Sequence, residues 1–181
     1  MELMLDLETM GIGPNAAIIA IGAVAFDLDR LELTGQEFYQ TIDLESSVEH
    51  GGGITPSTVL WWMQQSDEAR DEFKRPGGRI EEVLMYFHRW LPPTNCIQVW
   101  GNGANFDNVV LRTAYERLGL QAPWNFRNDR CFRTAKAMLP KVEIESTGVA
   151  HDALEDARWQ ARYLIEATRV DRWRIEREKG A

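Results

Sequence analysis

Apolar and polar residues alternate in the first strand that the sequence predicts. Leu3, Leu5 and Leu7 occupy every second position, so in an extended strand they point to one face. Asp6 and Glu8 then point to the other face, which places two carboxylates side by side near the end of the strand. Neighbouring like charges repel, and each loses hydration when it is buried, so a cation between them is the natural partner. The alternative interpretation is a strand that ends at the surface with two hydrated acids.

The remaining pattern predicts two further strands, then a series of helices, and finally strands and helices in alternation. The apolar run from Ala16 to Phe26 is typical of a strand buried on both faces. Strands are expected at residues 3–9, 16–27, 36–44, 97–100 and 126–132. Helices are expected to start at Pro56 and after Ser66, to cover residues 80–91 and 134–139, to follow Asn105, and to run from Ala153 onward.

This order of elements predicts an α/β fold in one domain over residues 1–181. The short connections between the first three strands favour antiparallel pairing, and the later alternation of strand and helix adds parallel strands. We therefore expect a mixed sheet flanked by helices, with a charged helix end at about residues 169–181 that is solvated or frayed. Ligands of such sheets gather at the carboxyl ends of strands, which is where Asp6 and Glu8 are expected.

Composition limits the classes of partner. With 181 residues and 44% hydrophobic content the chain can build a substantial core, while its net charge of −8 argues against coating long nucleic acid through a broad basic face. A protein that grips a short nucleic-acid end remains compatible, because bound metals supply local positive charge. The longest apolar run is too short to cross a bilayer and the N-terminus does not resemble a secretory signal, so we expect no membrane partner and a cytoplasmic location.

The segment from His151 to Asp156 predicts a helix start that carries candidate catalytic side chains. Asp152 followed by Glu155 is a variant of the capping box, with Asp152 as the N-cap. His151 and Asp156 then occupy the two positions that face each other across a helix start, so an imidazole and a carboxylate should meet. The structural alternative is a neutral His151 that makes one hydrogen bond to Asp156.

Asp107 is a further acid at an element boundary. It follows a strand and a glycine-rich turn, in the first turn of a predicted helix, where an acid favours the helix dipole without any further role. Together with the other candidates it gives four carboxylates and one base, all at strand ends or helix starts. These residues are Asp6, Glu8, Asp107, Asp156 and His151.

The order and local context of these residues resemble the DEDDh branch of the DnaQ-like 3'–5' exonucleases, which have a ribonuclease-H-like fold. The first motif matches as Asp6-Leu-Glu8-Thr9 and the second as Asn105-Phe-Asp107 followed by a helix. The third matches as His151 with an aspartate five residues later, a spacing that separates this branch from the one that uses tyrosine. The resemblance covers the chain from residue 3 to about residue 166.

Two further segments resemble a smaller subgroup of the same family. Thr58-Val-Leu-Trp61-Trp62 and the segment over residues 129–134 are similar to phage exodeoxyribonuclease A, exodeoxyribonuclease VIII-like proteins and a mycobacterial exoribonuclease. The subgroup includes enzymes for DNA and for RNA, so it leaves the choice between these substrates open.

The resemblance implies a metal-dependent 3'–5' exonuclease that acts on single-stranded DNA or RNA and releases nucleoside 5'-monophosphates. Two divalent cations, Mg²⁺ or Mn²⁺, would be held by Asp6, Glu8, Asp107 and Asp156, and His151 would act as general base on the attacking water. Ligands that are all oxygen suit these hard cations, and the sequence has no Cys/His cluster with the spacing of a zinc site.

Five residues are candidates for contact with the substrate. Thr9 and Met10 lie next to Glu8, where relatives of this family hold the terminal nucleotide. Trp61 and Trp62 could stack on the last base, but adjacent helix positions face different ways, so at least one should be core. We favour Trp62 for the substrate, and Phe106 is either a second wall of the site or core.

Other interpretations stay open at this stage. A ribonuclease-H-type endonuclease shares the fold and the two-metal chemistry, although His151 in the third motif favours the exonuclease. A non-catalytic or polymerase-associated nucleic-acid-binding module of the same fold is the alternative from another class. Arg130 and Arg133 could meet phosphates or be ordinary surface charges. A homodimer is compatible with the tryptophan content.

Overall fold

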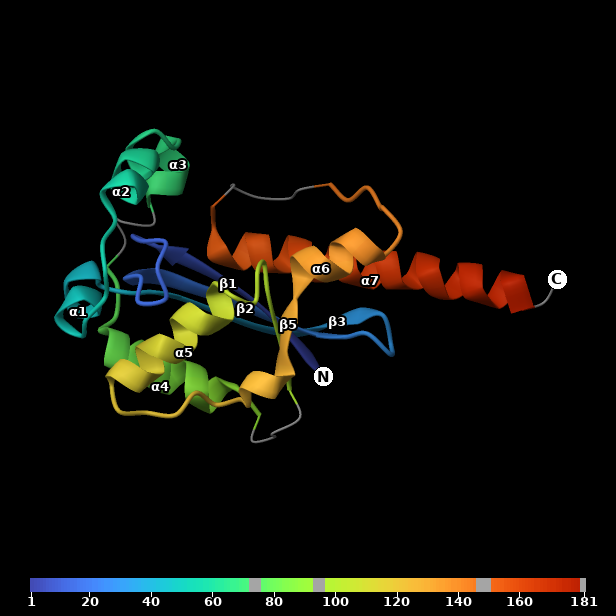
Figure 1. Cartoon of the computed structure of the whole chain (residues 1–181), viewed down its shortest axis with the longest axis horizontal. Helices are drawn as coiled ribbons and strands as arrows, with labels where there is room; N and C mark the ends of the chain where they lie inside the picture. Colours follow the sequence, from blue (N-terminus) through green and yellow to red (C-terminus); the bar gives the residue numbers. More distant parts are fainter. Residues whose placement is uncertain (72–75, 93–96, 146–150, 180–181) are drawn as a thin grey trace.

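A five-stranded mixed sheet forms the centre of the protein (Figure 1). The computed structural model describes residues 1–71, 76–92, 97–145 and 151–179. The strand order is β3-β2-β1-β4-β5, with antiparallel pairing among the first three strands and parallel pairing of β4 with β1 and of β5 with β4. The strands are β1 (Glu2–Thr9), β2 (Ile18–Asp27), β3 (Glu32–Thr41), β4 (Gln98–Gly101) and β5 (Asp129–Cys131). The predicted α/β class, with three antiparallel strands plus parallel strands, is confirmed.

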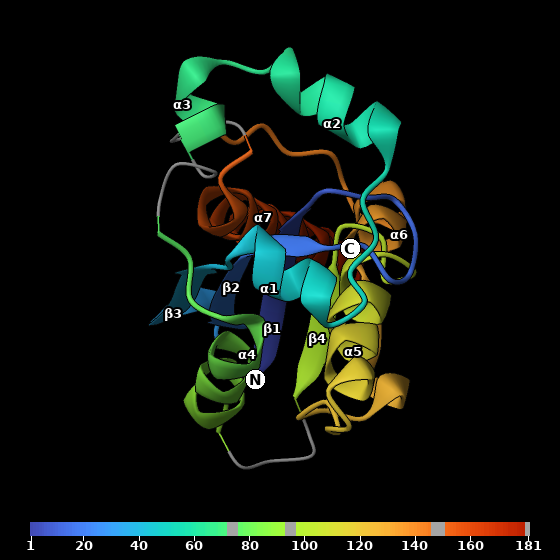
Figure 2. The same ribbon diagram turned by 90° about the vertical axis from the view of Figure 1, so that its left-hand side faces the viewer.

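Helices cover both faces of the sheet. One face packs against α4 and α5 and the other against α6 and α7, while α1, α2 and α3 lie beyond one end of the sheet (Figures 1 and 2). The helices are α1 (Leu44–Glu49), α2 (Pro56–Met63), α3 (Asp67–Arg70), α4 (Ile80–Trp90), α5 (Asp107–Arg117), α6 (Phe132–Met138) and α7 (Ala153–Lys179). Within these described helices, none is long and apolar enough to cross a membrane.

The alternation in β1 decides which layer each of its side chains joins. Leu3, Leu5 and Leu7 are buried in the core under α4 and α5, and Met4 is buried in the core under α6 and α7. Each buried leucine contributes roughly 1.5–3 kcal/mol relative to an exposed one, which fixes the register of this central strand. Since side chains alternate, Asp6 shares the face of Met4 and lies under α7.

The third strand differs from its predicted position. It covers Glu32–Thr41 rather than residues 36–44, and the residues from Leu44 onward form α1. The reason is local: the Asp43 carboxylate accepts a hydrogen bond of 3.0 Å from the Ser46 backbone N–H and so caps a helix. This cap competes with continued strand pairing after Thr41.

The segment predicted as a strand over residues 126–132 is also different. Phe126–Asn128 form a 3₁₀ turn, only Asp129–Cys131 form the strand, and α6 begins at Phe132 rather than at residue 134. The Asn125 side chain accepts a hydrogen bond from the Arg127 N–H, which favours the turn over an extended chain.

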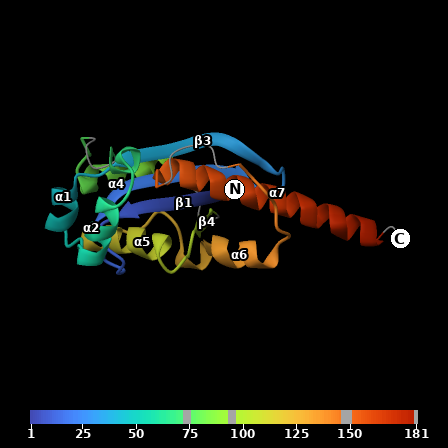
Figure 3. The same ribbon diagram turned by 90° about the horizontal axis from the view of Figure 1, so that it is seen from above.

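The charged end of α7 is helical and exposed. The helix continues to Lys179, so the prediction of solvation is correct, whereas fraying is not observed over the described residues. Its last turns extend past the rest of the molecule (Figure 3).

Candidate active site

The carboxyl end of β1 opens into a pocket of about 600 Å³, which we call the acidic pocket. Its walls include β1, α2, the start of α5, His151 and the first turn of α7. All the residues that the sequence predicted for catalysis, metal binding and substrate binding line it, except Met10. They are Asp6, Glu8, Thr9, Trp61, Trp62, Phe106, Asp107, His151 and Asp156.

Asp6 lies at the floor of the acidic pocket and is held by α7. It is 9% exposed, and its Oδ1 accepts a hydrogen bond of 2.8 Å from Gln160 Nε2. Gln160 is itself 2% exposed, and its other amide atom, Oε1, has no hydrogen-bond partner among the described residues. The buried amide of Gln160 donates its hydrogen bond to Asp6 and so fixes the orientation of that carboxylate. Residues that hydrogen-bond to metal ligands commonly orient them in this way.

A close approach of α7 to the sheet brings Asp156 to β1. Gly22 of β2 pairs directly with Asp6, and a Cβ at this glycine would lie 2.2 Å from the backbone of Ala153. Only glycine therefore lets the first turn of α7 lie against the strands here. The same contact aligns the start of the helix with the acids of β1.

Asp107 enters the pocket from the start of α5 and is 4% exposed. Gly101 at the end of β4 allows the start of α5 to lie close to the strand, as Gly22 does for α7. A Cβ at Gly101 would lie 2.4 Å from Asn108 Oδ1. Asn108 in turn donates a hydrogen bond of 2.8 Å to Val99 O, which ties the helix start to the strand. Asp107 therefore lies in the first turn of a helix, as the structural interpretation expected, and also lines the acidic pocket.

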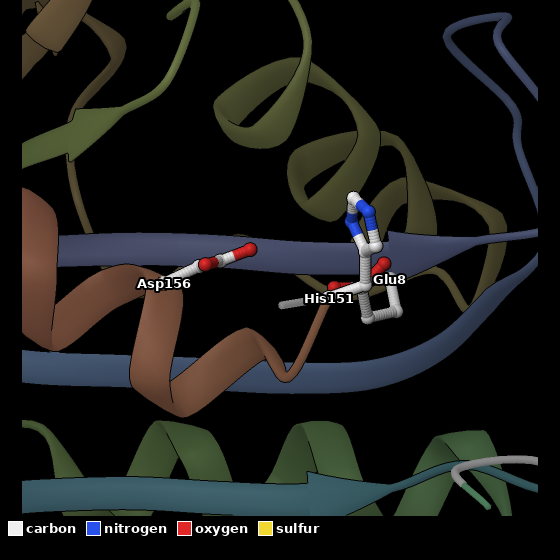
Figure 4. A group of neighbouring side chains, drawn as sticks. All are labelled: Glu8, His151 and Asp156. Atoms are coloured by element: carbon white, nitrogen blue, oxygen red, sulfur yellow. The ribbon is translucent and has the colours of Figure 1, made fainter. Parts of the chain in front are cut away.

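His151, Glu8 and Asp156 form the tightest group of the pocket (Figure 4). Their candidate ligand atoms lie within 4.8 Å of one another. Glu8 is 7% exposed on β1, Asp156 lies in the first turn of α7, and His151 precedes that helix with a left-handed φ of 68°. A ring nitrogen of His151 and a carboxylate oxygen of Asp156 are among these candidate ligand atoms, so the predicted meeting of imidazole and carboxylate is confirmed.

The capping box is confirmed only in its first half. Asp152 Oδ1 accepts hydrogen bonds of 3.0 and 3.1 Å from the N–H groups of Leu154 and Glu155 and therefore is the N-cap. Glu155 does not complete the box, because its carboxylate forms an ion pair with Arg158 one turn later. The guanidinium is a stronger partner for this carboxylate than a backbone N–H.

Carboxylates dominate the electrostatics of the pocket, which four of them line together with Arg133. Burial raises the pKa of Asp6 well above its ordinary value, neighbouring carboxylates raise it further, and the bond from Gln160 lowers it. Those carboxylates belong to Asp107, Glu8 and Asp156. Burial raises the pKa of Asp107 to about 7, against the opposing effects of backbone N–H groups and Arg133, and burial also raises the pKa of Asp156.

This donor set suits a divalent metal ion. Buried oxygen ligands of one sign are unfavourable by themselves and become favourable when a cation neutralises them. The group of Glu8, His151 and Asp156 offers one set of ligand atoms, and Asp6 and Asp107 offer further carboxylates beside it. The structure places His151 among the possible ligands, whereas the sequence assigned it to the base alone.

The two tryptophans of α2 differ in exposure. Trp62 is 3% exposed and donates a hydrogen bond of 3.0 Å from Nε1 to Thr9 O. Trp61 is 40% exposed, and its ring meets that of His151 edge to face with centroids 4.8 Å apart. The prediction that at least one tryptophan is core is confirmed by Trp62, and the accessible ring surface belongs to Trp61.

The other substrate candidates serve the structure as well. Thr9 Oγ1 donates to Gly11 O at 2.8 Å and so closes the turn after β1. Met10 packs against the buried cluster that contains Ile19 and does not reach the acidic pocket. Phe106 packs against the core and also lines the pocket, so both interpretations of this residue are correct.

Two residues of the site were missed or undervalued by sequence reasoning. Gln160 has no motif around it, and only its spacing of four residues from Asp156 hints that it shares the inner face of the helix. Arg133 lines the pocket and donates from Nε to Asn102 Oδ1 at 3.3 Å, although it could equally have been a surface charge.

Comparisons with known proteins agree with this geometry. Residues 1–168 match the family profile described as the 3'-5' exoribonuclease Rv2179c-like domain. The exodeoxyribonuclease of Enterobacteria phage T4 is 27% identical over 192 residues, which cover 86% of this chain and 83% of the phage protein.

Solved structures share the fold at low sequence identity. Exonuclease I of E. coli, in a complex with a dA16 oligonucleotide, has a TM-score of 0.63 and 16% identity over 92% of this chain. The present chain spans only 41% of the length of that protein. The nuclease domain of 3'hExo, a DEDDh family member bound to rAMP, has a TM-score of 0.58 and 18% identity, with 91% of this chain and 90% of that one covered.

Proposed function

Because the chain belongs to the family of 3'-5' exoribonuclease Rv2179c-like domains, and so is a 3'–5' exonuclease, we propose that it shortens single-stranded nucleic acid with two divalent cations, Mg²⁺ or Mn²⁺. The observation that carries the proposal is the convergence of four carboxylates and His151 at the end of β1. The products would be nucleoside 5'-monophosphates released one at a time from the 3' end.

Each residue of the acidic pocket has a defined task in this reaction. Asp6, Glu8, Asp107 and Asp156 would hold the cations, and Gln160 keeps the Asp6 carboxylate in one orientation. When bound, the cations supply a lowered pKa for the attacking water and charge stabilisation for the leaving 3' oxygen.

His151 would accept the proton of the attacking water on a ring nitrogen as the new bond to phosphorus forms. The bond to the 3' oxygen of the preceding nucleotide then breaks, and that oxygen takes a proton from solvent. Trp61 packs edge to face with the imidazole, and the candidate ligand atoms of His151, Glu8 and Asp156 lie within 4.8 Å of one another, so the ring is held beside the carboxylates.

The identity of the sugar is the open choice within this proposal. The family description names an exoribonuclease, whereas the phage relative is named an exodeoxyribonuclease. Recognition of the 2'-hydroxyl requires only one or two polar contacts, so either substrate fits a pocket of this chemistry. A direct comparison of matched RNA and DNA strands decides the matter.

The test is digestion of matched 5'-labelled single-stranded RNA and DNA with Mg²⁺ or Mn²⁺, for the unaltered protein and for Asp156→Asn. We expect a ladder that shortens from the 3' end, is lost with EDTA, and falls at least 100-fold in the variant, since one metal ligand is removed. Asp29→Asn is the matched control, because Asp29 is an exposed acid in the turn between β2 and β3. Internal cuts would indicate an endonuclease, and binding without cleavage would indicate a non-catalytic module.

Trp61, rather than the Trp62 favoured by the sequence, is the proposed platform for the terminal base. A base stacked on an aromatic ring gains roughly 1–3 kcal/mol, so Trp61→Ala should raise KM by about 5- to 150-fold. Trp61→Phe should recover most of this loss. Met63→Ala is the control on the same helix, because Met63 is 65% exposed and does not line the acidic pocket. Equal KM values for Trp61→Ala and the unaltered protein would remove Trp61 from the substrate site.

A further inference from the structure

A second hollow adjoins the acidic pocket. It lies between α6, α7 and residues 141–145, with a volume of about 1030 Å³, and we call it the basic groove. Arg133 lines both hollows, so the groove lies next to the pocket. The helix α2, which lines the acidic pocket, lies beyond the start of α7, whereas α6, which lines the groove, runs alongside α7 (Figures 1 and 3).

Three cations and two carboxylates line the groove, so its net charge is positive. Arg133, Lys136 and Lys141 are all exposed, and none forms an ion pair with a carboxylate of the described residues. What distinguishes these three cations is that they gather along one groove of a chain whose net charge is −8. Positive charge concentrated in this way favours an anionic ligand.

Aromatic rings hold the central cation in place without cancelling its charge. The ammonium of Lys136 lies 4.8 Å from the ring centre of Trp159 and 4.9 Å from that of Tyr163. Contact with ring faces restricts this flexible side chain and leaves its N–H donors free for a further partner. Lys136 also follows Arg133 by three residues on α6, so the two cations share one side of the helix.

Two acids also line the groove. Glu143 and Glu145 are exposed and alternate with Val142 and Ile144, which pack against the core under α7. A phosphate chain in the groove would run closest to the three cations and away from these two carboxylates. Charge therefore gives the groove a preferred path rather than a uniform attraction.

We propose that the basic groove binds the phosphates of the nucleotides that precede the 3'-terminal one in a single strand. Arg133 would meet the phosphate nearest the acidic pocket, and Lys136 and Lys141 those further upstream. This proposal rests on the proposed function, because it assigns the terminal nucleotide to the acidic pocket. It predicts that the protein discriminates by length, since a dinucleotide has no phosphate that reaches Lys136.

The test measures binding of 5'-fluorescent single strands of 12 nucleotides, as RNA and as DNA, by fluorescence anisotropy between 50 and 200 mM salt. All proteins carry Asp156→Asn and are assayed with Mg²⁺, so that the strand is not consumed. Each lost phosphate contact lowers the slope of log affinity against log salt by about 0.7, so Lys136→Gln with Lys141→Gln should lower it by about 1.4. We expect about a tenfold loss of affinity at 100 mM salt.

Two controls separate a contact from a change in net charge. Arg174→Gln with Lys179→Gln removes the same charge from the exposed end of α7, and the slope should stay unchanged. Lys136→Arg keeps the charge and should keep the slope. Thermal unfolding of each variant verifies that the Lys136 substitution leaves the aromatic cluster folded.

The outcomes distinguish this proposal from the proposed function. If strands of 12 nucleotides bind the Lys136/Lys141 variant and its parent with one slope, the groove is not a phosphate site, whatever the enzyme cleaves. Equal losses for the groove variant and the α7 control would likewise overturn it. Loss of the slope for 12 nucleotides with no change for a dinucleotide would establish the groove, even if the unaltered protein showed no cleavage.

Discussion

The first two turns of α7 carry acids in two opposite environments. On the inner face Asp156 lies in the acidic pocket, where burial raises its pKa and its closest partners are His151 and other carboxylates. On the outer face Glu155 pairs with Arg158, which also pairs with Glu37 of β3. The hydrogen bond from Arg158 holds the pKa of Glu37 below its usual range.

The difference shows how one helix performs two tasks. The outer ion pairs and the apolar residues beneath α7 fasten the helix to the sheet. That attachment holds the inner acids together although they repel one another. Side chains that were free to move would reduce this repulsion by moving apart. The inner face is thus unfavourable without cations and ready to bind them.

The largest test of this contrast concerns His151. We expect His151→Gln to lower kcat by about 10²- to 10⁴-fold, because the general base of the reaction is lost. Calorimetric titration with Mn²⁺ should show unchanged metal affinity if the imidazole acts as the base alone. His50→Gln is the matched control, since His50 ends α1 away from the pocket. A large loss of metal affinity in His151→Gln would instead make the imidazole a ligand.

The next test is the pH dependence of stability without metal. Because burial raises the pKa of Asp6, Asp107 and Asp156, the native state holds protons more tightly than the unfolded state between pH 4 and about 7. The free energy of unfolding should therefore fall as pH rises through this window, by a few kcal/mol in total. Thermal unfolding in EDTA at pH 5 and pH 8 measures the effect.

Added Mn²⁺ should restore much of the stability at pH 8, since it binds the ionised carboxylates of the native state. Asp107→Asn should flatten the pH dependence in EDTA. The pKa values of the paired acids Glu37 and Glu81 are lowered from 4.5, so their effect on stability is largely complete at pH 5, the lower pH of the comparison. A free energy of unfolding that rises from pH 5 to pH 8 without metal would contradict the claim that the acids on the inner face destabilise the protein when they ionise.

A smaller effect is expected from Gln160, which is buried on the inner face. Gln160→Met keeps the volume and removes the hydrogen bond to Asp6, so metal affinity should fall by about 10- to 100-fold. Calorimetric titration with Mn²⁺ provides the measurement. Unchanged affinity would mean that Asp6 needs no orienting partner.

Arg158 on the outer face of α7 provides the control for Gln160, and its substitution should have the smallest effect of these tests. Arg158 is 26% exposed and its partner Glu37 is 31% exposed, so Arg158→Gln should cost only about 1 kcal/mol of stability. Metal affinity and kcat should not change. If Arg158→Gln weakened metal binding as strongly as Gln160→Met, the two faces of α7 would not be independent.

Local pattern alone determined the parts of the protein that depend on neighbours in sequence. The two-residue period of β1 predicted which side chains share a face of the strand, because strand geometry alternates faces without help from the rest of the chain. The N-cap at Asp152 likewise predicted the start of α7 and the approach of His151 to Asp156. The family resemblance added the order of the motifs.

Only the tertiary structure decided the features that join distant segments. Gln160 and Asp6 are 154 positions apart, and no local period signals their hydrogen bond. The sequence does not distinguish which of two adjacent tryptophans is buried. The packing of α2 on Thr9 buries Trp62 and leaves Trp61 accessible at the pocket. The basic groove exists because α6 packs against α7, which turns scattered cations into one surface. Sequence fixes side-chain chemistry and local period, whereas long-range packing decides which of those side chains share a site.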